Sequence, residues 1–190
     1  MSINNIRFHF TEASKILEKF TSKEKNFQNI YSAGNFMIAA LLNGNKIISC
    51  GNGGSMCDAM HLAEELNGKF RDNRRPYAAV AISDPSYITC VANDYGYEKI
   101  FSRYVSGHGK KDDILFAIST SGNSKNVVNA AKTAKEKGMI VIGLTGKDGG
   151  ELAPLCNIEI RAPQSKYADR AQEIHIKVIH SLIDFIELNM

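Results

Sequence analysis

The stretch Ile114-Leu-Phe-Ala-Ile118, which runs directly into Ser119-Thr-Ser-Gly-Asn-Ser124, decides the fold class of this 190-residue chain. Its first part is continuously apolar, which is typical of a strand that is covered on both faces. Its second part is a polar turn, and a helical pattern follows it to about Lys137, with a helix stop at Gly138. This order of strand, turn and helix indicates a parallel sheet in a layered α/β domain.

Four further short apolar runs alternate with helical segments along the chain. They are Lys46–Cys50, Tyr77–Ile82, Met139–Leu144 and Ile158–Ile160. The sequence therefore predicts an α/β three-layer sandwich, in which helices flank a central parallel sheet. Ligands of such sheets bind at the carboxyl ends of the strands, so a site is expected in the loops that follow these runs.

Helical patterns also open and close the chain. Apolar residues recur at helical spacing before Asn43-Gly44, which supplies a helix stop, so two leading N-terminal helices are predicted. The segment from Tyr167 to Leu188 is predicted to be one helix whose apolar side chains sweep roughly 200° around its axis. Such an arc is wider than one packing face needs, which suggests burial on two sides and a subunit interface.

Bulk composition excludes several classes of protein. The hydrophobic content of 44% and the charged content of 23% are ordinary for a soluble globular protein. No apolar run approaches the ~20 residues that cross a bilayer. The N-terminus lacks the apolar block of a secretory signal, so a cytoplasmic location is expected. A net charge of +3 does not indicate a nucleic-acid or membrane partner, and the basic cluster Lys69–Arg75 is interpreted as a solvated segment or a small anion site.

The chain has four cysteines, and none of them forms a Cys-x-x-Cys motif. They are Cys50, Cys57, Cys90 and Cys156. We expect buried, reduced thiols rather than a disulfide framework or a cysteine-based zinc site.

The first strand leads into the glycine-rich stretch Gly51-Asn-Gly-Gly-Ser55. Glycines let backbone N–H groups approach a ligand closely, and Ser55 with Asp58 fits a helix N-cap and capping box. A tight turn that caps a helix is the simpler alternative. A dinucleotide fingerprint fails on spacing, because Met56 stands where the third glycine is needed.

Two other polar turns are candidates for ligand contact. In Ser119–Ser124, hydroxyl donors, free N–H groups and the positive end of a helix dipole would converge on a phosphate, although a plain hydroxyl-rich turn has the same pattern. No Gly-Lys-Ser/Thr follows, so this stretch is not a Walker loop. In Asn93–Gly96, Asp94 could bind sugar hydroxyls or simply close an Asx turn.

Two pairs of polar side chains lie at helical spacing. His61 and Glu65 are four residues apart and share one helix face. They could be a surface ion pair, two metal ligands, or a general base with its partner. On the last helix, Gln172 and His180 lie about 80° apart around the axis and roughly 12 Å apart along it. His175 points away into the apolar arc and is expected to be a hydrogen-bonded core histidine. Spacing alone does not join the two helices into one site.

Taken together, these stretches resemble the phosphoheptose isomerases of the sugar-isomerase (SIS) fold family. The likeness covers nearly the whole chain, and the combination of His61, Glu65, Gln172 and His180 is specific to this isomerase group. The stretches that carry it are Cys50–Ser55, Asp58–Glu65, Asn93–Gly96, Ser119–Ser124, Leu144–Gly150 and Tyr167–His180.

The resemblance implies an activity and an assembly. The activity is the conversion of sedoheptulose 7-phosphate to D-glycero-D-manno-heptose 7-phosphate by enediol proton transfer, the first step towards ADP-heptose for the lipopolysaccharide core. The chain would be a single SIS domain over 1–190, with 1–43 used in oligomer packing and 44–190 forming the α/β core and the C-terminal helix. We expect a homotetramer with active sites at subunit interfaces, a small sugar phosphate as the only partner, and no nucleic acid or membrane.

The resemblance also implies roles for individual residues. Glu65 would be the base, and His180 would be the acid or would help to open the sugar ring. One zinc ion per subunit would be bound by His61, Glu65, Gln172 and His180. Family members often have arginine where this chain has Lys69, and lysine lacks the bidentate fork. The substrate contacts would be Asn52, Gly53, Gly54, Ser55, Glu65, Asn93, Asp94 and Gln172 around the sugar, Asp169 at its hydroxyls, and Ser119, Thr120, Ser121 and Ser124 on the phosphate.

Two alternatives belong to other functional classes. A non-enzymatic SIS relative, which binds the replication initiator or senses a sugar phosphate, would resemble this chain along most of its length. The initiator-binding type lacks the glutamate and histidine that correspond to Glu65 and His180, and this chain has both, which favours the enzyme. A nucleotide-binding α/β protein is disfavoured by the failed fingerprint and the absent Walker lysine.

Overall fold

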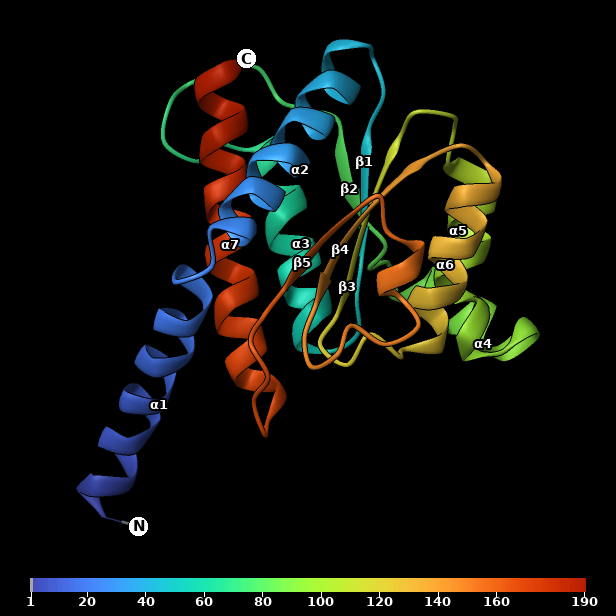
Figure 1. Cartoon of the computed structure of the whole chain (residues 1–190). Helices are drawn as coiled ribbons and strands as arrows, with labels where there is room; N and C mark the ends of the chain where they lie inside the picture. The colour runs from blue at the N-terminus through green and yellow to red at the C-terminus, as the bar shows by residue number, and fades with distance from the viewer. Residues whose placement is uncertain (1) are drawn as a thin grey trace.

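A computed structural model describes residues 2–190 (Figure 1). The helices are α1 Ile3–Thr21, α2 Glu24–Leu42, α3 Gly54–Asn67, α4 Pro85–Tyr95, α5 Ile100–His108, α6 Lys125–Glu136 and α7 Ala168–Asn189. The strands are β1 Ile47–Cys50, β2 Ala79–Ala81, β3 Ile114–Ser119, β4 Ile140–Thr145 and β5 Ile158–Arg161. Two short 3₁₀ turns, η1 Tyr97–Lys99 and η2 Ala153–Leu155, complete the elements. No helix in the described part of the chain is long and apolar enough to cross a bilayer.

The five strands form one parallel sheet in the order β2-β1-β3-β4-β5. Each of the five apolar runs contributes one strand, which confirms the predicted sheet. The second run forms only the three residues of β2, because this strand lies at the edge and pairs on one side alone. The strand order reverses direction at β1 and β3, so the loops after these two strands flank the switch point at which parallel sheets bind ligands.

Helices cover both faces of the sheet, so the predicted three-layer sandwich is correct. Figure 1 shows α2, α3 and α7 on one side of the strands and α5 and α6 on the other. One apolar cluster joins Phe116 and Leu144 to the first group of helices, and a second joins Leu115 and Val141 to the second group. Alternate residues of the central strands therefore point into separate buried layers, as strands covered on both faces require.

The two leading helices form as predicted, and α1 extends away from the rest of the chain (Figure 1). Only Ile16 and Phe20 of α1 are buried. Helix α7 packs against α1, α2 and α3, which cover its broad apolar arc. The arc is thus filled by helices of the same chain, and its width does not by itself indicate a partner subunit.

The predicted capping box at Ser55 is wrong. Helix α3 begins at Gly54, with Gly53 as the N-cap at a φ of 55°, so Ser55 lies inside the first turn and is buried. Asp58 is buried as well instead of closing a cap. Burial raises the pKa of the Asp58 carboxyl to about 6, although the nearby His61 acts in the opposite direction.

The cysteines are free thiols, but only part of the prediction for them holds. Cys50 is buried and Cys156 is partly buried, and burial raises the pKa of each thiol to about 12. Cys57 and Cys90 are exposed, because they lie on the outer faces of α3 and α4. The expectation that these two thiols are buried is therefore wrong.

His175 is the core histidine that the helical spacing predicts. Its side chain is fully buried, and its Nε2–H donates to the carbonyl oxygen of Thr145 at 2.8 Å, at the end of β4. Burial lowers the pKa of His175 to about 4, although the hydrogen bond to Thr145 acts in the opposite direction. The imidazole is therefore neutral and ties α7 to the sheet.

We expect replacement of His175 with glutamine, whose amide can also donate to Thr145, to flatten the dependence of stability on pH. The pKa of His175 is about 4 in the fold and 6.5 in an exposed histidine, so the unfolded chain binds more protons between these pH values. The native state then loses on the order of 3 kcal/mol as the pH falls from ~6.5 to ~4. Urea unfolding at pH 7 and pH 4 measures this loss. Equal losses in the wild type and in His175→Gln would contradict it.

Candidate active site

The glycine-rich loop after β1 is held by the opposite layer of helices. The side-chain amides of Asn52 and Asn126 exchange two hydrogen bonds of 2.8 Å, and the Tyr97 hydroxyl donates to Asn52 Oδ1 at 3.0 Å. The side chain of Asn52 is therefore occupied by the protein, and the backbone of Gly53 and Gly54 is the exposed part of the loop. A Cβ atom at Gly54 would overlap the amide of Gln172, so glycine is needed for α7 to approach the start of α3.

The serine-rich loop after β3 forms a compact turn. Ser119 Oγ donates to Ser124 Oγ at 3.0 Å, and Ser121 Oγ accepts the backbone N–H of Asn123 at 3.1 Å. Gly122 has a φ of 68°, and a Cβ there would overlap the carbonyl oxygen of Gly149. Ser124 is the N-cap of α6 and makes no side-chain cap bond, so the loop delivers its hydroxyl groups at the positive end of a helix.

A small cavity beside this loop has basic and hydroxyl groups in its wall. Its volume is about 80 Å³, and its lining includes Thr120 and Ser121 from the loop. Lys147, Ser165 and Lys166 line the same cavity. Hydroxyl donors, ammonium groups and a helix N-terminus together suit an anion such as a phosphate.

The side chains from the two distant helices meet at His61. His61 Nε2 lies 3.0 Å from His180 Nε2 and 3.7 Å from Glu65 Oε1, so α3 and α7 contribute to one cluster. The imidazole rings of His61 and His180 meet edge to face, with centroids 5.1 Å apart. Phe70 lies beside His180, with ring centroids 5.8 Å apart. The predicted acid and base are thus brought together through a shared neighbour.

Glu64 orients His61. Its Oε1 lies 3.0 Å from His61 Nδ1, which places the proton of a neutral imidazole on Nδ1 and leaves the Nε2 lone pair facing Glu65 and His180. A carboxylate behind a histidine in this way is the usual support of a metal-binding histidine.

The donor chemistry of the cluster suits a zinc ion, and ligand atoms of His61, Glu64 and Glu65 lie within 4.8 Å of one another. Histidine nitrogen and carboxylate oxygen are both preferred zinc donors. Gln172, the fourth predicted ligand, has its amide against Gly54, where the contact between α3 and α7 begins, two helical turns before the His61 cluster.

Helices α3 and α7 lie side by side and run in the same direction. Gly54 meets Gln172 at the start of α3, and His61 meets His180 two turns later, across a separation of 119 residues. Because both helices advance about 1.5 Å per residue, the two pairs keep the same offset along their length. This register places the glycine-rich loop at the start of the contact between the two helices and the His61 cluster further along it.

Other predicted residues make no polar contact with the His61 cluster in the described part of the chain. Asn93 and Asp94 do not form a separate turn, because α4 continues through Tyr95; they are exposed in its last turn, and Asn93 donates to Asp94 at 2.8 Å. Asp169 is paired with Arg170 at 3.1 Å. Lys69 is exposed in the segment after α3, and no polar contact of its side chain is seen among residues 2–190.

Several residues that the sequence did not single out shape the site. They are Glu64 behind His61, Phe70 beside His180, and Asn126 and Tyr97 around Asn52. The contact between His61 and Glu64 could have been predicted, because residues at i, i+3 spacing are neighbours on a helix surface. The other contacts join segments that are far apart in sequence, and no local pattern reports them.

Known proteins resemble this chain in sequence. The model of the SIS domain family matches residues 9–146. A phosphoheptose isomerase of Haemophilus ducreyi is 56% identical over 190 residues, which cover 100% of this chain and 98% of the relative. A phosphoheptose isomerase of Glaesserella parasuis is 57% identical over 185 residues, with 97% and 96% covered.

Solved structures agree with the sequence relatives. A phosphoheptose isomerase from Francisella tularensis superposes with a TM-score of 0.93 at 35% identity, covering 99% of each chain. One from Neisseria gonorrhoeae has a TM-score of 0.91 at 38% identity and covers 97% of this chain and 98% of its own. On these grounds the chain belongs to the SIS domain family and, within it, to the phosphoheptose isomerases.

Proposed function

We propose that the chain converts sedoheptulose 7-phosphate to D-glycero-D-manno-heptose 7-phosphate by enediol proton transfer. The observation that carries the proposal is the meeting of Glu65 and His180 at His61, along the contact between α3 and α7 that starts at the glycine-rich loop. In this role the chain would supply the first intermediate of ADP-heptose synthesis for the lipopolysaccharide core. The relatives at 56–57% identity bear the name of this activity.

The phosphate end of the substrate is assigned to the serine-rich loop. The hydroxyl groups of Ser119, Thr120, Ser121 and Ser124 and the start of α6 would hold the phosphate. Lys147 and Lys166, in the wall of the adjacent cavity, would balance its charge. The sugar would extend from there past Gly53 and Gly54 towards the His61 cluster. Anchoring at one end converts the reaction at the other end into an effectively unimolecular step.

The reacting end needs one base and one proton donor. Glu65 would remove a proton from C1 of the ketose and return it to C2, which gives the aldose. His180 would donate a proton to the carbonyl oxygen at C2 and accept one from the hydroxyl at C1. Its exposed ring faces His61 Nε2, so a proton can reside on either imidazole. Asp169 and the exposed backbone of Gly53 and Gly54 would hold the sugar hydroxyls, with Asn93 and Asp94 as further contacts, whereas the side chain of Asn52 is occupied and Ser55 is buried.

A zinc ion is the cofactor that this donor set suits. We propose that His61, Glu65 and His180 hold one ion per subunit, with Gln172 as the fourth ligand once its amide leaves Gly54. A bound zinc ion acts as a Lewis acid and stabilises the negative charge of an enediolate. A carboxylate that is bound to a metal ion is a weaker base. Glu65 would therefore have to leave the zinc ion before it accepts the proton.

We further propose a cytoplasmic homotetramer with active sites at subunit interfaces, built from a single SIS domain. The support is the exposed apolar surface of the leading helices. Ile6, Phe8 and Phe10 are 58–74% exposed on the projecting part of α1. Phe27 and Tyr31 of α2 line an apolar cavity of about 380 Å³ between the leading helices and α7. Packing of 1–43 against other copies would cover both surfaces.

We expect Glu65→Gln to lower kcat for sedoheptulose 7-phosphate by about 10²- to 10⁴-fold, because the amide cannot accept the proton. Substrate binding, measured by calorimetry, should remain. In D₂O the wild-type product should carry solvent deuterium at C2, since the proton on Glu65 exchanges with water before its return.

The matched control is Glu136→Gln, an exposed glutamate at the end of α6, which should leave kcat unchanged. Retained turnover in Glu65→Gln would remove Glu65 from the role of base. Complete exclusion of deuterium from C2 would favour a hydride shift or a shielded proton.

We expect zinc titration of chelator-treated protein to show one ion per chain and His180→Ala to weaken its affinity by about tenfold or more. His108→Gln, in the helix layer on the other face of the sheet, should bind zinc as the wild type does. An unchanged affinity in His180→Ala would contradict the proposed ligand set. Full turnover of the stripped protein at saturating substrate would make zinc structural or dispensable.

A further inference from the structure

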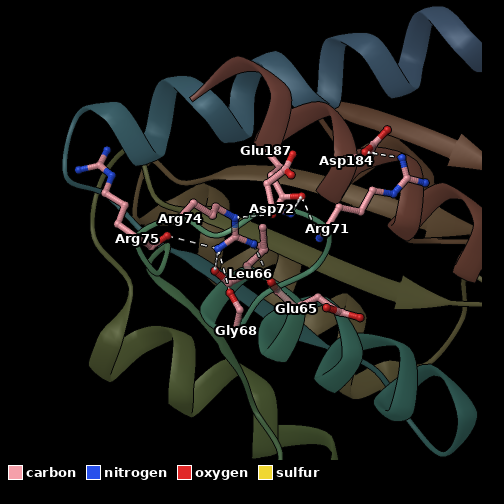
Figure 2. A network of polar contacts seen from close by, with 9 residues as sticks. All are labelled: Glu65, Leu66, Gly68, Arg71, Asp72, Arg74, Arg75, Asp184 and Glu187. Atoms are coloured by element: carbon pink, nitrogen blue, oxygen red, sulfur yellow. Dashed lines mark hydrogen bonds and ion pairs between the residues drawn. The ribbon is translucent and has the colours of Figure 1, made fainter.

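The segment between α3 and β2 carries a buried arginine. Figure 2 shows Arg74 between the carboxyl end of α3 and Glu187 on α7. The sequence interpretation of Lys69–Arg75 as a solvated segment or an anion site is wrong for this residue, because its side chain is only 9% exposed. The guanidinium also stacks on the buried ring of Tyr77, 4.4 Å from its centroid.

The Arg74 guanidinium completes the hydrogen bonding at the end of α3. It donates to the carbonyl oxygens of Glu65 at 2.8 Å, Leu66 at 3.0 Å and Gly68 at 3.1 Å. The last four carbonyls of a helix have no partner within the helix, and a cation is favoured there. One of the three carbonyls belongs to Glu65 itself, the residue whose side chain enters the His61 cluster.

Glu187 holds the other side of Arg74. Its side chain is 3% exposed, and its Oε1 accepts from Arg74 Nε at 2.9 Å. Its Oε2 accepts the backbone N–H groups of Arg71 at 3.0 Å and Asp72 at 3.1 Å. Burial alone would raise the pKa of Glu187. The two N–H groups and Arg74 together have a larger, opposite effect, so the pKa lies below the usual range of a glutamate. The carboxylate is ionised and every contact to it is directional.

The segment that carries Arg74 also contacts His180, through Phe70. Phe70 packs beside the ring of His180 and precedes the two residues whose N–H groups bind Glu187. Helices α3 and α7 are thus joined at three levels: Gly54 to Gln172, His61 to His180, and the end of α3 to Glu187 through Arg74.

We propose that the Arg74–Glu187 pair positions the reacting groups. It would set the position of α3 along α7 and would thereby hold Glu65 and His180 in the geometry that proton transfer requires. Arg74 and Glu187 touch no reacting atom and act through the backbone of Glu65 and through Phe70. The inference rests on the proposed function, because it takes Glu65 and His180 as the reacting groups.

A stabilising role alone does not explain this arrangement. A buried ion pair is weak evidence for stability, since desolvation offsets much of the attraction, and apolar side chains of similar size can pack as well. What apolar side chains cannot do is donate hydrogen bonds to four carbonyls and a carboxylate, as Arg74 does. Lysine cannot do so either, because its single ammonium lacks the rigid fork. The hydrogen bonds of Arg74 therefore indicate that its role is to hold the carboxyl end of α3 in a fixed position relative to α7.

The test uses conservative variants of the full chain, because Arg74→Ala would leave Glu187 buried without a cation. We expect Arg74→Lys and Glu187→Gln each to lower kcat by about 10- to 100-fold, since small misplacements of reacting groups cost rates of this size. The KM should stay within about threefold, because the phosphate loop belongs to β3 and α6. Both parameters are measured per folded protein, well below the unfolding temperature.

The exposed pair of the same segment and helix is the matched control. Arg71 NH1 binds Asp184 Oδ1 at 2.7 Å, with the Arg71 side chain 64% exposed. Because the Arg71 guanidinium also lies over the Phe70 ring, 5.3 Å from its centroid, the control changes the partner: Asp184→Asn should keep kcat within about twofold, as exposed pairs contribute little.

The outcomes separate this inference from the proposed function. The positioning role alone would be overturned if Glu65→Gln lost turnover while Arg74→Lys and Glu187→Gln kept the kcat of Asp184→Asn. A lower unfolding temperature at unchanged kcat, or loss of the fold in both variants, would assign the pair to stability and overturn it too. Retained turnover in Glu65→Gln would instead overturn the proposed function.

Discussion

The parallel contact between α3 and α7 is the constraint on which the site depends. These helices begin more than a hundred residues apart in the sequence, and their side chains meet at a nearly constant offset, which is 119 residues for His61 and His180. At the start of the contact, the absence of a side chain at Gly54 lets Gln172 approach the α3 backbone. At its far end, Arg74 joins the last carbonyls of α3 to Glu187. Between these ends, a carboxylate and two imidazoles share one cluster.

The sheet provides the second half of the geometry. Because β1 and β3 are neighbours in a parallel sheet, their carboxyl ends place the glycine-rich and the serine-rich loops side by side. The amide pair between Asn52 and Asn126 then fixes one loop to the helix that follows the other. The serine-rich loop that we propose for the phosphate and the His61 cluster that we propose for proton transfer are separate places in the fold, which suits a long substrate that carries its phosphate away from its carbonyl.

Much of this could be predicted from the sequence, for physical reasons that particular residues show. The continuous apolar run Ile114–Ile118 predicted a strand covered on both faces, and the pointing of His175 into the apolar arc predicted a buried histidine. Both are local patterns, which depend only on neighbouring residues. The pairing of His61 with His180 came from the resemblance, since helical spacing says nothing about contacts between distant helices.

The failures have physical causes as well. Ser55 looked like an N-cap, but Gly53, with its positive φ, is the N-cap, so the helix starts two residues earlier. Arg74 looked like surface charge, because its partner Glu187 lies 113 residues away. The width of the apolar arc on α7 was interpreted as burial against a partner subunit, but helices α1, α2 and α3 of the same chain cover it, so the predicted interface stays a prediction. In each case a contact from outside the local window decided the outcome.

The most direct measurement is a crystal structure of the Glu65→Gln assembly with sedoheptulose 7-phosphate bound. Our account predicts that the phosphate binds to the loop Ser119–Ser124. It also predicts that C1 and C2 of the sugar lie between residue 65 on α3 and His180 on α7. A ligand bound elsewhere, or residue 65 and His180 in separate pockets even with neighbouring subunits present, would contradict it.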